Sequence, residues 1–143
     1  MSSKPSRPQI PTDMKAFNEK LISEFRANRG ELSGQLAGRK LMLLTTTGAR
    51  SHEPRTVVIG FRPSSDRYVA IASNNGSDVP PHWFRNLMAE PIATVEVGAD
   101  KVKVRARVAT QHERNELAKL IDYLERQQAL TSREIPIVVF EKV

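Results

Sequence analysis

Apolar residues recur near the start of the chain with the spacing of an α-helix. Steps of three or four residues place successive side chains on one helical face. Here those steps connect Met14, Phe17, Leu21 and Phe25. Gly30 follows at a position where glycine commonly ends a helix. We therefore predict an amphipathic helix over residues 13–28.

Six later segments have the composition of β-strands. They are rich in apolar residues or alternate between apolar and polar ones, and they cover residues 40–47, 55–61, 67–73, 92–97, 101–109 and 135–141. Short polar turns, including one at 63–66, separate the first three, which predicts an antiparallel meander. The segment 101–109 alternates most regularly, with lysine and arginine on one face and valine and alanine on the other.

Two further segments have helical character. Pro81 suits the first turn of a short helix over residues 82–90, and Pro91 ends it. Residues 111–128 carry leucine and isoleucine at helical spacing, which predicts one continuous helix. The order of elements indicates a mainly β, α+β fold: a six-stranded antiparallel barrel with helices at its ends and flank. We expect a single domain over residues 12–143, after a disordered leader over residues 1–11.

The charge balance adds an attraction for anions. Lysine and arginine number 22 against 16 acidic residues, so the net charge is +6. This excess fits nucleic acid, a membrane surface or an anionic small molecule. The basic row on 101–109 has no interleaved aromatic residues, so a solvated face is favoured there over a nucleic-acid site.

Several classes of protein are excluded or disfavoured. The 143 residues contain no cysteine, which excludes disulfides, thiolate nucleophiles and cysteine-ligated metals. No stretch approaches the roughly 20 apolar residues that span a bilayer, and residues 1–11 lack the apolar core of a signal peptide. We expect a cytoplasmic protein. The alternative of a peripheral membrane contact through Lys4 and Arg7 stays open.

No side chains form a recognisable catalytic or metal motif. His52, His82 and His112 match no metal-ligand spacing, and the chain has no phosphate-binding or dinucleotide glycine motif and no nucleophile elbow. We therefore predict no catalytic side chain and no metal. The chemistry must come from elsewhere if the protein is an enzyme.

Two loops are candidates for binding an anion. Residues 48–55 join two strands and carry Arg50 and Arg55, whose guanidinium groups suit phosphate or carboxylate, although a solvated turn explains them equally well. Residues 73–76 precede the helix that carries Trp83 and Phe84. These rings either line a site or belong to the core.

The motifs in this order resemble the deazaflavin-dependent nitroreductase family. The resemblance spans residues 17–143 and rests on residues 41–56, 67–73 and 83–87, Pro91, and residues 94–98, 105–108 and 133–139. It implies a split β-barrel that binds coenzyme F-420, whose deazaflavin ring carries a tail of phosphate and glutamates. Its reduced form delivers hydride to quinones, activated alkenes such as enones, or nitroaromatic compounds.

The resemblance also implies a role for each candidate loop. Arg50 and Arg55 would hold the phosphate and the start of the tail, and residues 73–76 would line the same groove. Residues 82–84 would lie against the ring, with residues 56–58 as its floor, and Asn86 would tie the helix to the barrel. The implied cofactor-binding set is Thr47, Gly48, Ala49, Arg50, Ser51, Arg55, Thr56, Val57, Val58, Ser73, Asn74, Asn75, Gly76, His82, Trp83 and Phe84.

The sequence departs from the family pattern at four places. Ala49 and Asn74 replace basic residues, no proline lies near Val58, and Tyr123 stands out of register as the sole tyrosine of residues 121–130. The alternatives are a split barrel that binds FMN or a tetrapyrrole, or a carrier that binds its cofactor without catalysis. The expected partner is a small-molecule substrate rather than nucleic acid, and the protein is expected to be a monomer or a homodimer.

Overall fold

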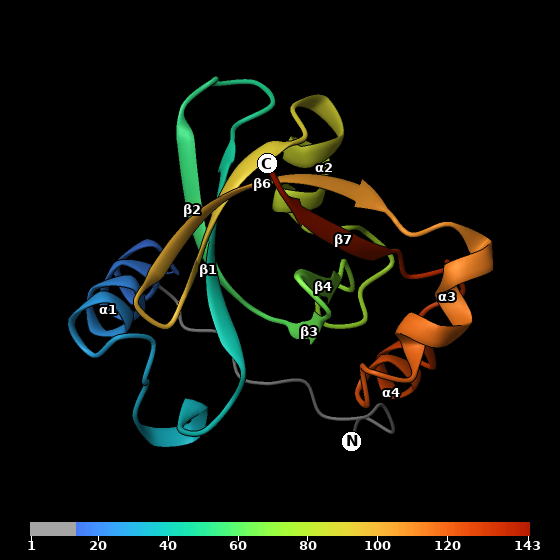
Figure 1. Ribbon diagram of the computed structural model, residues 1–143, viewed down its shortest axis with the longest axis horizontal. Helices are drawn as coiled ribbons and strands as arrows, with labels where there is room; N and C mark the ends of the chain where they lie inside the picture. Colours follow the sequence, from blue (N-terminus) through green and yellow to red (C-terminus); the bar gives the residue numbers. More distant parts are fainter. Residues whose placement is uncertain (1–13) are drawn as a thin grey trace, which may run out of the picture.

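Seven strands and four α-helices form residues 14–143, the part of the chain that the computed structural model describes (Figure 1). The predicted leader over residues 1–11 lies outside these residues. The helices are α1 (Met14–Ala27), α2 (His82–Ala89), α3 (Gln111–Ala118) and α4 (Leu124–Gln128), with a short 3₁₀ turn at Gly34–Leu36. The strands are β1 (Leu41–Thr47), β2 (Pro54–Gly60), β3 (Arg62–Ser64), β4 (Arg67–Ile71), β5 (Ile92–Val97), β6 (Asp100–Val108) and β7 (Ile137–Lys142).

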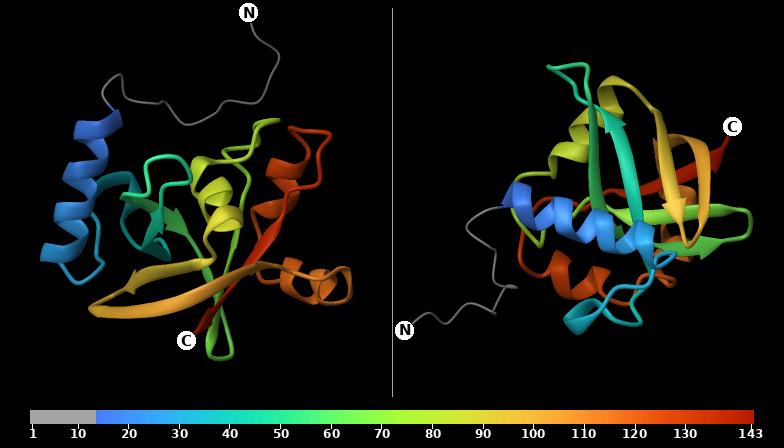
Figure 2. Two further views of the ribbon diagram at one scale, coloured as in Figure 1. Left: turned by 90° about the horizontal axis from the view of Figure 1, so that it is seen from above. Right: turned by 90° about the vertical axis from the view of Figure 1, so that its left-hand side faces the viewer.

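All the strands belong to one antiparallel sheet in the order β2-β1-β5-β6-β7-β4-β3. The two edge strands, β2 and β3, are consecutive in the sequence and only Phe61 separates them. The sheet must therefore curl until one end of each edge strand meets the other, and both views in Figure 2 show this curvature. The expected α+β class is confirmed, and the sheet is a half-open barrel.

The predictions of six strands and of a meander were wrong. Residues 62–64 form an extra strand, β3, where a turn was predicted. Pro63 lacks a backbone donor, but an edge strand tolerates this because its outer side needs none. The strand after it, β4, does not pair with β2 but with β7, where Tyr68 lies opposite Phe140. This pairing joins residues far apart in the chain, which local periodicity cannot reveal.

The predicted helix over residues 111–128 is interrupted. Between α3 and α4 the backbone makes tighter i-to-i+3 hydrogen bonds, including that from the Leu120 amide to the Leu117 carbonyl, 3.0 Å long. No glycine or proline marks the break. It is associated instead with a tertiary contact, because Asp122 in the break pairs with Arg62 of β3 at 2.8 Å. The break therefore depends on a strand that the sequence did not reveal.

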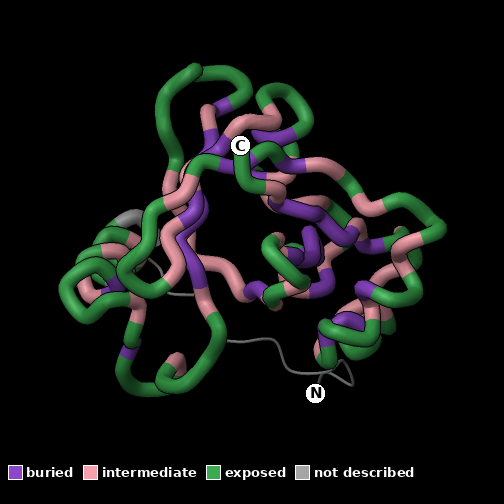
Figure 3. Tube along the Cα trace, viewed as in Figure 1, coloured by how far each residue is buried: buried purple, intermediate pink, exposed green. Residues whose placement is uncertain are grey.

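Buried apolar side chains form clusters on both sides of the curled sheet. Figure 3 marks the buried stretches of the chain in purple. The cluster inside the curl includes Trp83, Leu87 and Phe140, so α2 closes part of the interior. A second cluster packs α3 and α4 against β4 and β7. The predicted stripe of α1 is buried mainly at Phe25, which packs with Leu32 and Leu43.

The basic row on β6 faces solvent as predicted, with one exception. Lys101, Lys103 and Arg105 are exposed. Arg107 instead forms ion pairs with Glu113 of α3 and with Glu141 of β7, the latter 3.0 Å long. The last member of the row therefore fastens α3 to the sheet. Within residues 14–143, no helix is long and apolar enough to cross a membrane.

Candidate functional site

The loop between β1 and β2 is a tight turn closed by its own backbone. The Gly48 amide donates to the Glu53 carbonyl at 2.8 Å, and the His52 amide donates back to the Gly48 carbonyl at 2.9 Å. A Cβ on Gly48 would collide with Ser51 Oγ in its present position and approach the Glu53 carbonyl oxygen to 3.2 Å, so any larger residue would require Ser51 to move. Ser51 Oγ also accepts a long hydrogen bond of 3.5 Å from Arg55 Nη2.

Asn86 of α2 holds this loop against the sheet. Its Oδ1 accepts from the Ala49 amide at 3.0 Å, and its Nδ2 donates to Thr46 Oγ1 at 3.0 Å. Both side-chain groups of a buried asparagine are thereby satisfied, which a buried amide requires. The structural role expected for Asn86 is confirmed.

Two hollows lie on either side of Trp83. The first, which we call the loop pocket, measures about 760 Å³ and lies between the β1–β2 loop, α1 and α2. The second, which we call the barrel pocket, measures about 670 Å³ and lies between β2, residues 73–75 and α4. Both fall in the range of about 300–1,000 Å³ typical of small-molecule sites. The residues that line both pockets are Asn18, Val57 and Trp83.

The predicted residues divide between the two pockets. The loop pocket is lined by Gly48, Ala49, Arg50, Ser51, Arg55, Thr56, Val57, His82 and Trp83. The barrel pocket is lined by Val57, Val58, Ser73, Asn74, Asn75 and Trp83. Thr47, Gly76 and Phe84 line neither pocket. Residues 73–76 were expected to line the same groove as Arg50 and Arg55, but residues 73–75 line the other pocket. His82 was expected beside Trp83 and Phe84 against the ring, but it lines the pocket that contains the two arginines.

Trp83 combines the two roles that were left open for it. It is only 8% exposed and belongs to the inner core cluster, yet its ring forms a wall of both pockets. Phe84 packs edge-on against it with ring centres 6.5 Å apart, and Phe140 supports it at the same distance. Packing from two sides fixes the indole in place, which suits a wall that must orient a flat ligand.

The loop pocket carries a net positive charge. Arg50 and Arg55 are exposed, and within residues 14–143 neither forms an ion pair with an acidic side chain. Glu19 is the one acidic residue among those that line this pocket. Guanidinium groups without an acidic partner beside turn amides favour phosphate and carboxylate ligands.

An arginine from the far end of the chain fixes the turn over residues 73–76. Arg133 Nη2 donates to the carbonyls of Ala72 and Ser73, both at 3.0 Å, and its Nε donates to the Ser77 carbonyl at 2.9 Å. Asn74 and Asn75 adopt positive φ angles of 49° and 57°, and Gly76 follows at 76°. A Cβ on Gly76 would lie 2.6 Å from a Leu130 side-chain carbon, so this turn packs tightly against the segment after α4.

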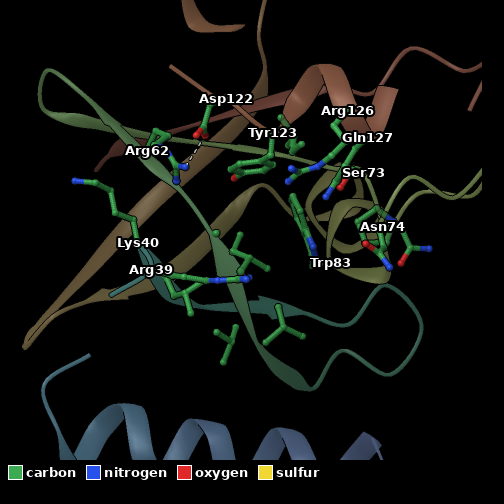
Figure 4. A pocket seen from close by; sticks show the side chains of 18 of the residues that line it. Arg39, Lys40, Arg62, Ser73, Asn74, Trp83, Asp122, Tyr123, Arg126 and Gln127 are labelled. Carbon is green, nitrogen blue, oxygen red and sulfur yellow. Dashed lines mark hydrogen bonds and ion pairs between the residues drawn. The ribbon is translucent and has the colours of Figure 1, made fainter. Parts of the chain in front are cut away.

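Sequence reasoning missed parts of two walls of the barrel pocket, which Figure 4 shows. The missed residues are Arg39, Lys40, Arg62, Asp122, Tyr123, Arg126 and Gln127. The assumption of one continuous helix concealed Asp122, Tyr123, Arg126 and Gln127. Tyr123 lies in the break between α3 and α4, and the break gives its side chain access to the pocket. For the other residues, the one indication in the sequence was the adjacent basic pair Arg39 and Lys40 just before β1.

Tyr123 is held by contacts from β2 and β3. The Arg62 guanidinium lies 5.0 Å from the centre of its ring. Its hydroxyl oxygen lies 3.1 Å from where a Cβ on Gly60 would be, so Gly60 leaves space for it. Burial raises the pKa of the Tyr123 hydroxyl, although the positive charge of Arg62 acts in the opposite direction. The phenol therefore keeps its proton at neutral pH and can donate a hydrogen bond.

Metal-ligand clusters are absent from the described part of the chain. Within residues 14–143, no group of three histidine, aspartate or glutamate side chains is placed to hold a metal ion. Neither pocket contains a serine–histidine pair with a hydrogen bond between them. What the two pockets offer is shape, an indole wall, guanidinium groups and a protonated phenol.

Comparison with known proteins gives a consistent result. A family model described as F420H(2)-dependent quinone reductase matches residues 19–142. An F420H(2)-dependent quinone reductase of Mycobacterium tuberculosis strain H37Rv is 30% identical over 127 residues, covering 82% of this chain and 85% of that protein.

Two solved structures agree with this match. A structure described as an F420-H2 dependent reductase, FDR-A, is 30% identical and covers 72% of this chain and 95% of its own, with a TM-score of 0.66. A structure described as a domain-swapped dimer is 27% identical, and the match covers 86% of this chain and 93% of that one, with a TM-score of 0.68.

Proposed function

The chain belongs to the F420H(2)-dependent quinone reductase family, and on that premise we propose that it transfers a hydride from reduced coenzyme F-420 to a small electron-poor acceptor. Quinones are the leading class of acceptor, with enones and other activated alkenes next. One observation carries the assignment: two pockets of ligand size meet at Trp83, and the loop pocket presents Arg50 and Arg55 without acidic partners.

The loop pocket fits the anionic tail of the coenzyme. Arg50 and Arg55 supply guanidinium groups for phosphate and glutamate oxygens, and the turn at residues 48–53 supplies backbone amides. The basic residue missing at Ala49 leaves these two arginines as the main cationic contacts in the loop. Asn86 keeps the loop in register with α2, so the same contact that closes the fold also places the arginines.

The barrel pocket fits the deazaflavin ring. Val57 and Ile59 lie on one face of β2 and form an apolar floor, Trp83 forms one wall, and Ser73 follows the end of β4. A flat heteroaromatic ring needs apolar faces and a few polar groups at its edge, and this pocket supplies both. The ring and the tail would then lie on the two sides of Trp83.

The contribution of the chain is binding, orientation and exclusion of water. When bound, the reduced coenzyme supplies the hydride. The acceptor gains that hydride and one proton, so a quinone leaves as a hydroquinone and the coenzyme leaves oxidised by two electrons. The Tyr123 hydroxyl holds a proton at the barrel pocket, where it can donate a hydrogen bond to the acceptor oxygen. The reduced coenzyme would lose one proton for each hydride it gives, so the overall reaction takes no net proton from water, and His82 lines the other pocket.

The decisive experiment is a titration of the purified protein with coenzyme F-420 and with FMN. Trp83 is the one tryptophan in the sequence, so its fluorescence reports directly on both pockets. We expect quenching by coenzyme F-420 and none by FMN at equal concentration. Quenching by FMN alone would instead support the FMN-binding alternative.

A second measurement separates an enzyme from a carrier. Reduced coenzyme F-420 is mixed with the protein and a panel of quinones, enones and nitroaromatic compounds, and its reoxidation is followed by absorbance. We expect catalytic reoxidation with quinones. Tight binding with no turnover on any member would instead establish a carrier.

The assembly is a separate part of the proposal. The similarity to a structure described as a domain-swapped dimer makes a homodimer the form that we propose. Light scattering on the eluting protein measures its mass directly, and 16.0 kDa would correspond to a monomer.

A further inference from the structure

Two arginines of the barrel pocket have no acidic partner within residues 14–143. Arg39 precedes β1, and Arg126 lies on α4 at the opposite wall. In Figure 4 both guanidinium groups extend toward the side of the pocket where Trp83 lies, whereas Lys40 points away from it. Two cations from distant parts of the chain thus converge on one space.

The remaining charges of the pocket do not neutralise this pair. Asp122 is the one acidic residue among those that line the barrel pocket, and it forms an ion pair of 2.8 Å with Arg62. Arg62 is held further by donating to the Phe61 carbonyl at 2.8 Å. The cavity therefore has a positive potential, which a concave protein surface concentrates.

We propose that Arg39 and Arg126 bind an anionic group of the acceptor, so that the enzyme prefers electron-poor acceptors that carry a carboxylate. This inference rests on the proposed function, because it concerns what binds beside the coenzyme ring. Guanidinium groups bind carboxylates through paired hydrogen bonds, and two of them on opposite walls select both the charge and the orientation of a ligand.

The tail of the coenzyme has its own cations elsewhere. Arg50 and Arg55 line the loop pocket and not the barrel pocket, and Trp83 stands between the two spaces. Arg39 and Arg126 line the barrel pocket alone. An anion held by the second pair is therefore best supplied by a different molecule, the acceptor.

The first test measures binding without any coenzyme. The probes are 4-nitrobenzoate and 4-nitrobenzamide, which share a ring and differ in charge, and the readout is quenching of Trp83 fluorescence. We expect Arg39→Gln and Arg126→Gln each to weaken nitrobenzoate binding by about fivefold, the size expected for a partly exposed charge-assisted contact, and to leave nitrobenzamide within about twofold. Lys103→Gln, an exposed control on β6 that lines neither pocket, should change neither affinity.

The second test measures turnover with two acceptors of equal reactivity. A benzoquinone with a propionate side chain and its propanamide differ in charge far from the ring. The ratio of their kcat/KM values is compared between the wild type and the three variants, together with the Kd of coenzyme F-420. We expect the ratio to favour propionate in the wild type, to fall in Arg39→Gln and Arg126→Gln, and to persist in Lys103→Gln, with the coenzyme Kd unchanged throughout.

Other outcomes overturn the inference in distinguishable ways. A weaker coenzyme Kd with an unchanged acceptor ratio would assign the two arginines to the coenzyme. Equal binding of nitrobenzoate and nitrobenzamide by the wild type would show that the pair does not select anions. Failure of the wild type to bind coenzyme F-420 would refute the proposed function instead, and the first test would still report on the anion site.

Discussion

Arg133 donates a hydrogen bond of 3.0 Å to the backbone carbonyl of Ser73, although 60 residues separate them in the sequence. The same guanidinium reaches the carbonyls of Ala72 and Ser77. Ser73 lies at the barrel pocket and Arg133 does not line it. The polar edge of the pocket is therefore placed by a residue that has no contact with a ligand there.

Replacing Arg133 should disturb the pocket as well as the fold. Arg133→Met removes three hydrogen bonds to carbonyls, and we expect the free energy of unfolding to fall by about 2–4 kcal/mol, since bonds from charged groups contribute about 1.5–3 kcal/mol each and part of that is recovered by water. We also expect the coenzyme to bind at least about tenfold more weakly, measured below the unfolding transition. Arg105→Met, on the solvent face of β6, is the control. Lower stability with unchanged coenzyme affinity would restrict Arg133 to a structural role.

Replacing Arg55 should weaken coenzyme binding with little effect on the fold. We expect Arg55→Ala to reduce the affinity by about 1.5–3 kcal/mol, or about tenfold to 150-fold, as for the loss of a charge-assisted contact. The Kd is measured by Trp83 fluorescence at low and at moderate salt, and the difference between variants should shrink as salt rises. Lys103→Ala removes an exposed charge on the far strand and should leave the Kd unchanged. An unaltered Kd in Arg55→Ala would remove this residue from the site.

Gly76 is expected to be irreplaceable for steric reasons. Gly76 and Gly38 both have positive φ angles, 76° and 75°, but a Cβ on Gly38 would meet nothing within 4 Å whereas one on Gly76 would meet Leu130. Gly38→Ala should cost about 1 kcal/mol of stability from backbone strain alone, and Gly76→Ala about 2–4 kcal/mol. Chemical denaturation of both variants measures the difference. Equal losses would show that the contact with Leu130 relaxes freely.

Glu113 is expected to make stability depend on pH in the acid range. The hydrogen bond from Arg107 chiefly, and that from the Thr110 amide, lower the pKa of Glu113 to about 2 from an ordinary 4.5. The folded state thus favours the ionised carboxylate. Its stabilisation is complete above about pH 5 and is lost as pH falls from 4.5 toward 2.

The variant Glu113→Gln tests this dependence. We expect it to lose about 1 kcal/mol at pH 7, a modest value because the pair is partly exposed, and to have a flatter stability profile between pH 5 and pH 2. Glu116→Gln, whose exposed partner is Lys119, is the control and should follow the wild type. Denaturation curves at several pH values provide the comparison, and parallel profiles for Glu113→Gln and the wild type would contradict the assignment.

Much of the secondary structure follows from local patterns, and the pairing of strands does not. The alternation on β6, the apolar spacing of α1 and the prolines that flank α2 are properties of neighbouring residues, so local patterns were sufficient to predict these elements. The pairing of β4 with β7 depends on the curl of the whole sheet. The break before α4 coincides with an ion pair between Arg62 and Asp122, which joins residues 60 positions apart.

The residues of the candidate site also divide into those that local patterns predict and those that only the tertiary structure brings together. Arg50, Arg55 and Trp83 were predicted because each lies in a short motif that carries its own chemical meaning. Arg39 and Arg126 have no such motif, and they meet only because closure of the sheet brings the start of β1 opposite α4. The division of the predicted set into two pockets also depended on the position of the Trp83 ring, which no spacing in the sequence determines.

The position of β7 in the sheet has a consequence for how the protein is made. This last strand lies between β6 and β4 and joins the group β2-β1-β5-β6 to the pair β4-β3. During synthesis on the ribosome, residues 137–142 emerge after the other six strands of the sheet, and until then no strand pairing can join these two pieces of the sheet. The walls of the barrel pocket come from both pieces. The coenzyme can therefore be captured only after translation has passed this strand, and a nascent chain arrested before Ile137 would be unable to bind it.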